Sequence, residues 1–159
     1  LRFIWADIFK AAFAETEAAM AVQGDAVTKL RAYGQAWMRY WLCHPENYRV
    51  VFLNQDTGTT EPHPDVDGMD QPFFADGALA VAHLQLVAGV FAEGMATGQL
   101  REMPPEQGVQ VLITQLLGLA HGLITMPEFN WGPAEVLCEA AMEASLRGFM
   151  AAPPARGAT

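Results

Sequence analysis

The sequence predicts an all-α domain of about six helices, and three observations support this fold class. Apolar residues recur every three or four positions along most of the chain, which is the period of an amphipathic helix. Glycine and proline stand between these periodic segments, where helices begin and end. No segment alternates polar and apolar residues over enough positions to form a strand. A length of 159 residues suits one domain with its own core, which we place at residues 1–151, with a frayed tail at 152–159.

Aromatic stripes define the first two helices. The first begins near Trp5 and ends before Gly24, which suits a left-handed cap, while Asp25 can cap the second helix. The second ends at the His44–Pro45 step, because proline disfavours the helical conformation in the residue before it. The stripes are Ile8, Phe9, Ala12, Phe13 and Met20 on the first helix, and Leu30, Tyr33, Trp37 and Trp41 on the second.

The middle of the chain combines a short helix, a loop and a long apolar helix. A helix over residues 46–53 follows Pro45 directly, and residues 54–71 are rich in Gly, Pro, Thr and Asp, which predicts a mobile acidic loop. The next helix spans residues 72–97 and stops at Gly98. Because residues 77–92 contain no charged side chain, we expect other elements to surround this helix.

The last two helices are expected at residues 106–126 and 133–150. Residues 107–127 contain no Asp, Glu, Lys or Arg, but polar side chains interrupt a run that would need about 20 predominantly apolar residues to span a bilayer. We therefore expect no membrane span, and we interpret this helix as part of a subunit interface. Gly118 and Gly122 would allow another helix to approach closely, since each otherwise costs the helix about 1 kcal/mol.

The net charge of −9 excludes a nucleic-acid-binding surface on these residues. Eighteen acidic side chains oppose nine basic ones, whereas binding a phosphate backbone takes clustered Lys and Arg. No Lys or Arg occurs between Arg49 and Arg101, and seven acidic residues fall in that interval. Cys43 and Cys138 have no partner at CxxC spacing, so we expect reduced thiols in a cytoplasmic protein.

The residue patterns of common catalytic and metal sites are missing from the sequence. The residues three positions before His44, His83 and His121 are not acidic, which excludes the Glu-x-x-His pairs of a di-iron bundle. Neither cysteine has a ligand at zinc-site spacing, and residues 65–70 lack the sixth-position glycine of an EF-hand loop. Ser145 is the only serine and has no evident base beside it. We therefore expect no enzyme activity, no metal and no cofactor.

Aromatic and histidine side chains on the helices are the remaining candidates for function. Core filling is the simplest interpretation for most of the aromatics. A buried imidazole, however, needs a hydrogen-bond partner, because leaving it without one costs about 1–3 kcal/mol. His83 shares a helix face with Val87 and Phe91, and His121 shares one with Thr125. Each histidine is either satisfied within the core or lines a ligand cavity, since small-molecule sites are mostly apolar with a few polar groups.

Four segments carry a further pattern in a fixed order. Residues 30–33 read Leu-Arg-Ala-Tyr, and residues 42–52 read Leu-Cys-His-Pro-Glu-Asn-Tyr-Arg-Val-Val-Phe. Residues 91–101 read Phe-Ala-Glu-Gly-Met-Ala-Thr-Gly-Gln-Leu-Arg, and residues 117–123 read Leu-Gly-Leu-Ala-His-Gly-Leu. Together they resemble the part of TetR-family transcriptional repressors that follows the DNA-binding headpiece.

This resemblance implies a ligand-binding and dimerisation domain. In the family, the last two helices pair with those of a second subunit in a four-helix bundle, and the ligand cavity lies among the earlier helices. The homodimer interface would then include Leu112, Leu116, Gly118, Leu119, Gly122, Leu137, Ala141, Ala144 and Gly148. The cavity would be lined by Phe9, Phe13, Trp37, Trp41, Phe52, His83, Val87, Phe91, His121 and Thr125.

The resemblance also implies the effector-binding half of a transcriptional repressor that responds to a small apolar or aromatic molecule. Operator DNA would be bound only through a helix-turn-helix headpiece, which we expect upstream of Leu1. The candidate lining residues include no acidic side chain, which favours a neutral or anionic effector over a cation. A helical dimerisation module with no small-molecule ligand is the alternative.

Overall fold

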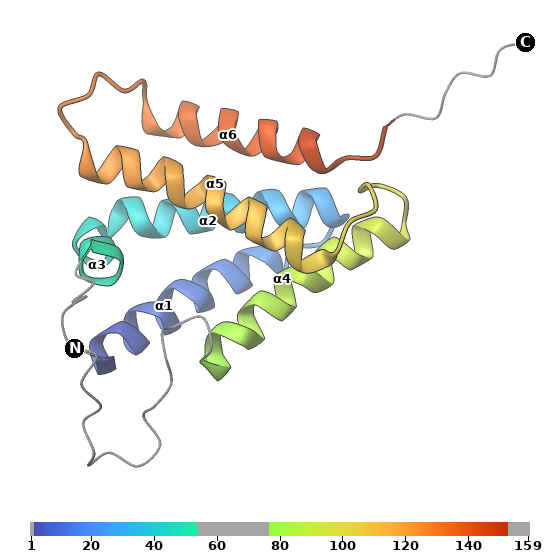
Figure 1. Ribbon diagram of the computed structural model, residues 1–159, viewed down its shortest axis with the longest axis horizontal. Helices are drawn as coiled ribbons and strands as arrows, with labels where there is room; N and C mark the ends of the chain where they lie inside the picture. Colours follow the sequence, from blue (N-terminus) through green and yellow to red (C-terminus); the bar gives the residue numbers. More distant parts are fainter. Residues whose placement is uncertain (1, 54–76, 153–159) are drawn as a thin grey trace, which may run out of the picture.

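A computed structural model describes residues 2–53 and 77–152, and this part of the chain is all-α (Figure 1). It contains no β-strand, only an isolated antiparallel bridge between Leu100 and Met150. The predicted loop at residues 54–71 and residues 153–159 of the predicted tail lie outside the described residues. The elements are α1 (Arg2–Met20), α2 (Ala26–Cys43), α3 (Pro45–Tyr48), the π-helical turn η1 (Arg49–Leu53), α4 (Ala78–Ala96), α5 (Pro105–Thr125) and α6 (Ala134–Phe149).

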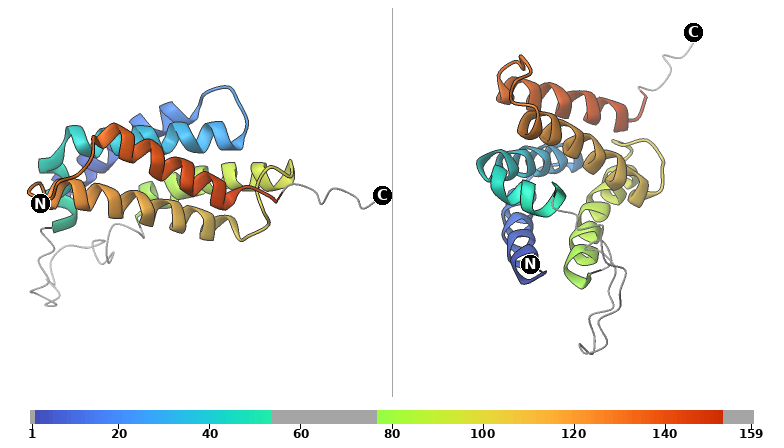
Figure 2. Two further views of the ribbon diagram at one scale, coloured as in Figure 1. Left: turned by 90° about the horizontal axis from the view of Figure 1, so that it is seen from above. Right: turned by 60° about the vertical axis from the view of Figure 1, so that its left-hand side comes forward.

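Helix α2 is the centre of the fold, because it contacts α1, α4, α5 and α6. The helices α5 and α6 lie side by side on one side of α2, and α1 and α4 lie on the other (Figures 1 and 2). The predicted stripe of α2 is buried, with Leu30 and Tyr33 at 0% exposure and Trp41 at 1%. The aromatic pattern of the sequence thus marked the helix around which the others pack.

The boundaries of α2 agree with the capping residues expected from the sequence. The Asp25 carboxylate accepts a hydrogen bond from the Thr28 backbone N–H at 2.8 Å, and this bond lowers the pKa of Asp25. Gly24 has φ +152°, and a Cβ at this position would lie 2.8 Å from the Thr28 side chain. Helix α3 starts at Pro45, which needs no backbone N–H at the first helical position.

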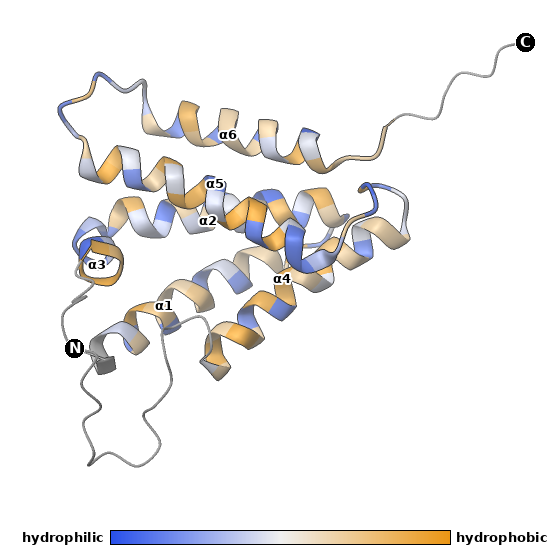
Figure 3. Cartoon of the chain, viewed as in Figure 1, coloured by the Kyte–Doolittle hydropathy of each residue, from blue (hydrophilic) through white to orange (hydrophobic). Residues whose placement is uncertain are grey.

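Helix α4 differs from its prediction, because it is not surrounded by other elements. Leu79, Val81 and Leu86 are 44%, 39% and 52% exposed in the described chain, and Figure 3 shows hydrophobic residues around most of this helix. The helix begins at Ala78, with Gly77 in an extended conformation before it, and residues 72–76 of the predicted helix lie outside the described residues. By length and composition alone α4 and α5 could each cross a membrane, a property that core helices of soluble proteins share.

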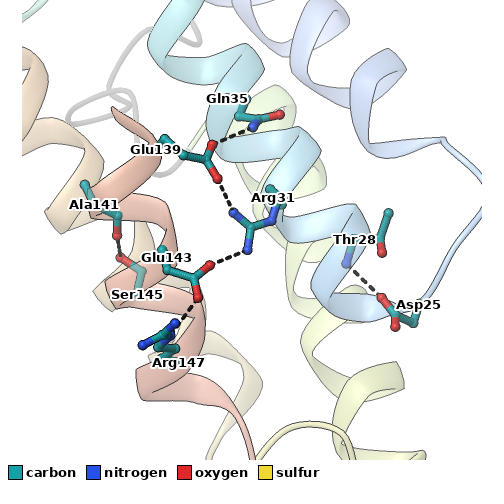
Figure 4. A network of polar contacts seen from close by, with 9 residues as sticks. All are labelled: Asp25, Thr28, Arg31, Gln35, Glu139, Ala141, Glu143, Ser145 and Arg147. Carbon is teal, nitrogen blue, oxygen red and sulfur yellow. Dashed lines mark hydrogen bonds and ion pairs between the residues drawn. The ribbon is translucent and has the colours of Figure 1, made fainter. Parts of the chain in front are cut away.

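Helix α6 is joined to α2 by a network of charged side chains (Figure 4). The Arg31 guanidinium donates to Glu139 and to Glu143, each at 2.7 Å, and Gln35 donates to the other oxygen of Glu139 at 3.0 Å. Arg147 donates to Glu143 at 2.6 Å, and these bonds lower the pKa of the Glu143 carboxyl. The network fixes α6 along the exposed edge of α2.

Beneath this network the two helices are in close contact. Gly34 of α2 lies against Met142 of α6, which is fully buried, and a Cβ on Gly34 would overlap the Met142 sulfur. The Ser145 hydroxyl of α6 lies within hydrogen-bond distance of both the Ala141 carbonyl and the Gln115 side chain of α5. This side of α2 has no room for a larger residue.

Candidate functional site

A cavity lies among α1, α2, α4 and α5, away from the contact of α2 with α6, and its volume of about 630 Å³ is typical of small-molecule sites. Four helices and the π-helical turn contribute to its walls, and most of the lining is apolar. The lining residues are Phe9, Ala12 and Phe13 of α1; Tyr33, Trp37 and Trp41 of α2; Phe52 of η1; Ala80, Val81, His83, Leu84, Gln85 and Ala88 of α4; and Glu106, Val109, Gln110, Ile113, Thr114 and Leu117 of α5.

One end of the cavity is built from aromatic rings. Phe9 and Trp41 meet edge to face with ring centroids 6.0 Å apart, and Trp41 meets Phe52 in the same way at 5.2 Å. Trp37 lies 5.9 Å from Trp41, and Phe13 lies 5.7 Å from Phe9. The two edge-to-face pairs have a geometry that aromatic rings prefer.

A chain of polar groups joins α1, α4 and α2 beside the aromatic wall. His83 Nδ1 is 2.9 Å from the Glu17 carboxylate, and His83 Nε2 is 3.1 Å from the Tyr33 hydroxyl. The His83 ring also stacks on Phe13, with centroids 3.9 Å apart and planes 8° from parallel. Burial lowers the pKa of His83, although Glu17 acts in the opposite direction. The neutral ring then donates from Nδ1 to Glu17 and accepts the Tyr33 hydroxyl proton at Nε2.

The Tyr33 end of this Glu17–His83–Tyr33 chain keeps its proton near neutral pH. Tyr33 is completely buried, and burial strongly raises the pKa of its hydroxyl, so the group stays protonated. Within the described ranges, no three His, Cys, Asp or Glu side chains are grouped so that they could hold a metal ion. The polar chain therefore orients the histidine and holds three helices together at the cavity wall.

Polar side chains gather where α4 and α5 line the cavity together. Gln85 of α4, and Glu106, Gln110 and Thr114 of α5, are exposed residues of the lining. The Thr114 hydroxyl donates to the backbone carbonyl of Gln110 at 2.7 Å. The cavity thus has an aromatic interior and a polar edge, and Glu106 is the only carboxylate among its described lining residues.

One hydrogen-bond donor in the aromatic wall is left without an acceptor. Trp41 is 1% exposed, and its indole Nε1–H has no partner within the part of the chain that the structure describes. An unsatisfied buried donor costs about 1–3 kcal/mol. A water molecule or a ligand oxygen beside Trp41 would remove this cost.

The structure brings together six of the ten residues predicted to bind a ligand. Phe9, Phe13, Trp37, Trp41, Phe52 and His83 all line the cavity.

The other four predicted ligand residues lie elsewhere. Val87 and Phe91 are fully buried outside the lining, and Phe91 packs edge to face on Phe149 of α6 at 5.0 Å. His121 is exposed near Tyr48, with its Nδ1 3.5 Å from the Tyr48 hydroxyl, and Thr125 donates to the His121 carbonyl at 2.6 Å. Neither residue reaches the cavity.

The sequence interpretation missed all the lining residues of α5 and five of the six on α4. On α5 these residues recur at positions 106, 109–110, 113–114 and 117, a helical period that was visible in the sequence. The apolar stripe of α5 marks the side of the helix that faces the core. The cavity lies beside that stripe, where Gln110 and Thr114 alternate with Val109 and Ile113. Glu17 could not be found in this way, because its partner His83 lies 66 residues further along the chain.

Solved structures share this arrangement of helices. A transcriptional regulator of the TetR/AcrR family from Thermobifida fusca superposes with a TM-score of 0.61 and 18% identity, over 91% of this chain and 69% of that one. The chain has a TetR-like fold. A protein of unknown function from Rhodococcus sp. RHA1 superposes with a TM-score of 0.70 and 16% identity, over 92% of this chain and 70% of that one. No family model and no curated protein matches the sequence.

The TetR-like fold places the residues predicted for a dimer interface in two different environments. Leu112 and Leu116 are 0% and 2% exposed, because the subunit's own helices cover them. Gly122 is also covered, because its Cα lies under the Trp131 ring. Gly118, Ala144 and Gly148 are exposed, and Leu119, Leu137 and Ala141 are half-buried.

Proposed function

We propose that this chain is the effector-binding and dimerisation half of a TetR-like transcriptional repressor that responds to a small apolar or aromatic molecule. The observation that supports it best is the cavity of about 630 Å³ whose walls come from α1, α2, α4 and α5. A helical module that only dimerises has no need for such a space, since protein interiors otherwise pack densely. The TetR-like fold is the second support.

The proposed mechanism is linkage between the cavity and α1. Phe9 and Phe13 line the cavity from α1, and Glu17 of the same helix is bonded to His83. A ligand that fits one position of these side chains better than another would shift α1 between two positions. Operator DNA would be bound by a helix-turn-helix on the N-terminal side of α1 in the full-length protein, which we propose to be cytoplasmic.

Ligand binding can be tested with a matched pair of variants on α4. Ala88 lines the cavity, whereas Ala82 is an exposed residue of the same helix outside the lining. Ala88→Leu should fill part of the cavity and abolish the thermal stabilisation produced by hydrophobic and aromatic compounds, while Ala82→Leu should preserve it. Compounds that stabilise both variants equally would bind elsewhere. Failure of a broad library to stabilise the wild-type chain would favour the module without a ligand.

We propose that the outer faces of α5 and α6 form the homodimer interface. Gly118 of α5 has no atom near the position of a Cβ, and the same holds for Gly148 of α6. The same two helices also carry exposed apolar residues, including Val111 of α5 at 40% exposure and Val136 of α6 at 62%. An isologous two-fold interface needs such a face, since each subunit presents the same patch to the other.

Light scattering tests this interface. The wild-type chain should have twice its monomer mass of 17.3 kDa. Gly118→Arg should give a monomer, because a charged side chain would enter the helix contact. Gly89→Arg is the control, since Gly89 is an equally open helical glycine on α4. A wild-type monomer at all concentrations, or a dimer that survives Gly118→Arg but not Gly89→Arg, would contradict the assignment.

A further inference from the structure

The charges around the cavity carry an inference about the chemical class of the ligand, and this inference rests on the proposed effector-binding function. Glu106 lines the cavity. Glu17 is not itself a lining residue, but its carboxylate is 2.9 Å from the His83 ring, which lines the cavity. One carboxylate therefore lines the cavity and a second is bonded to a histidine of its wall, while the remaining lining is mostly apolar.

No basic side chain of the described residues lines the cavity to balance these carboxylates. Lys29 is paired with Glu93, Arg31 with Glu139 and Glu143, and Arg49 with Glu46, all outside the lining. The sequence has no Lys or Arg between Arg49 and Arg101, so residues 54–76 contain neither.

The histidine in the wall does not provide a positive charge at neutral pH. Burial lowers the pKa of His83, so its bond to Glu17 joins a neutral ring to a carboxylate and leaves one negative charge. The start of α5 does not provide one either. Glu106 lies in the first turn of α5, where its carboxylate already takes the position at which the helix dipole would attract an anion.

We propose that the cavity binds amphipathic cations, molecules with an apolar or aromatic body and a protonated amine or quaternary ammonium group, and excludes organic anions. The body would lie against the aromatic wall of Phe9, Trp37 and Trp41, whose ring faces attract a positive charge. An anion would lose its hydration next to two carboxylates without gaining a counter-charge. The indole N–H of Trp41 is a neutral donor that serves an ether or carbonyl oxygen, so it does not call for a negative ligand.

This assignment reverses part of the expectation from the sequence. The ligand residues predicted from the sequence include no acidic side chain, which favours a neutral or anionic ligand over a cation. The lining of the cavity contains Glu106, and Glu17 is hydrogen-bonded to His83, which is another lining residue. Folding brings these carboxylates to the cavity from α1 and α5, which the sequence pattern could not show.

Three probes of nearly equal size test the proposal: naphthylmethylamine, naphthalenemethanol and naphthoate, which are positive, neutral and negative at pH 7. Isothermal titration calorimetry should show the amine binding about tenfold more tightly than the alcohol, with the carboxylate weakest. In Glu106→Gln the preference of the amine over the alcohol should fall while the affinity for the alcohol stays the same. Glu102→Gln, an exposed acid outside the lining, should leave that preference unchanged.

The outcomes separate this inference from the function on which it rests. If naphthoate binds as tightly as the amine, or if Glu106→Gln leaves the amine preference unchanged, the charge assignment is wrong while the cavity remains a ligand site. If none of the three probes binds and Ala88→Leu changes nothing in a wider library, the effector-binding function itself is wrong. Glu17→Gln is a second test that does not depend on Glu106, and it should also reduce the preference for the amine over the alcohol.

Discussion

The two sides of α2 have opposite packing, although one helix forms both. Toward α6 the side chains leave no space, with Gly34 against Met142 and a network of Arg31, Glu139 and Glu143 above them. Toward α1 and α4 the same helix borders a cavity of about 630 Å³. The stability of the domain and its capacity to bind a ligand are thus placed on different faces of the same element.

This difference shows where the chain can change without unfolding. Tight packing makes each buried methylene on the α6 side contribute to the free energy of unfolding. A side chain that is enlarged toward the cavity meets empty space, so such a replacement should alter binding more than stability. Four experiments test this contrast, and they are given from the largest expected effect to the smallest.

Truncation on the packed side should have the largest effect. Leu146 of α6 is 1% exposed, and Leu146→Ala should lower the free energy of unfolding by about 2–5 kcal/mol, because the removed atoms leave a cavity that the neighbours cannot fill. Urea denaturation followed by circular dichroism measures this loss. A cost below that of a surface substitution would mean that α6 is not tightly packed.

Insertion of one methyl group should come next. Gly34→Ala places a Cβ where Met142 lies, and we expect a cost of about 1–3 kcal/mol in the same denaturation experiment. Gly89→Ala is the matched control, since a Cβ there meets no atom, and it should stabilise the helix slightly. Equal effects of the two substitutions would contradict the close contact of α2 and α6.

Acid should weaken the cavity side through His83. In the unfolded chain a histidine takes up a proton near its ordinary pKa of 6.5, whereas burial lowers the pKa of His83 in the folded protein. The stabilisation is therefore complete only well above pH 6.5 and is lost as the pH falls through and below that value.

The variant His83→Gln should remove this pH dependence, and urea denaturation above and below pH 6.5 measures it. His44 is exposed and serves as the control, so His44→Gln should keep the dependence of the wild-type chain. A loss of stability in acid that persists in His83→Gln would assign the effect to other groups.

Filling the cavity should change stability least. Ala88→Leu adds apolar volume to a hollow region, so we expect a change in the free energy of unfolding of less than about 1 kcal/mol. The contrast with Gly34→Ala is the direct measure of how different the two sides of α2 are. A cost as large as that of Gly34→Ala would mean that the cavity is filled by side chains in solution.

The sequence predicted the helices well because their buried faces are periodic. The stripe of Leu30, Tyr33, Trp37 and Trp41, the Asp25 cap and the break at Pro45 were all correct. The prediction for α4 was wrong, since a lack of charge was read as burial on all sides, whereas Leu79 and Leu86 are exposed in the described chain. Composition reports how apolar a helix is, but not how many neighbours cover it.

The cavity could be predicted only in part, for a different reason. Aromatic residues that line it, such as Phe9 and Trp41, were recognisable from their number and spacing. Val87 and Phe91 share a helix face with His83, but that face turns toward the core and α6 further along α4. The sequence gives the angle of each residue about its helix axis, whereas the identity of the neighbour depends on how the helices cross.

The two adjacent indoles in the cavity wall also provide an optical signal. Of the four tryptophans in the chain, Trp37 and Trp41 line the cavity, and Trp131 lies against Gly122 near the end of α5. The Trp41 N–H has no acceptor in the described chain, so its fluorescence should respond to any ligand that supplies one. Non-absorbing compounds could therefore be followed by tryptophan emission alone, in real time and without a label.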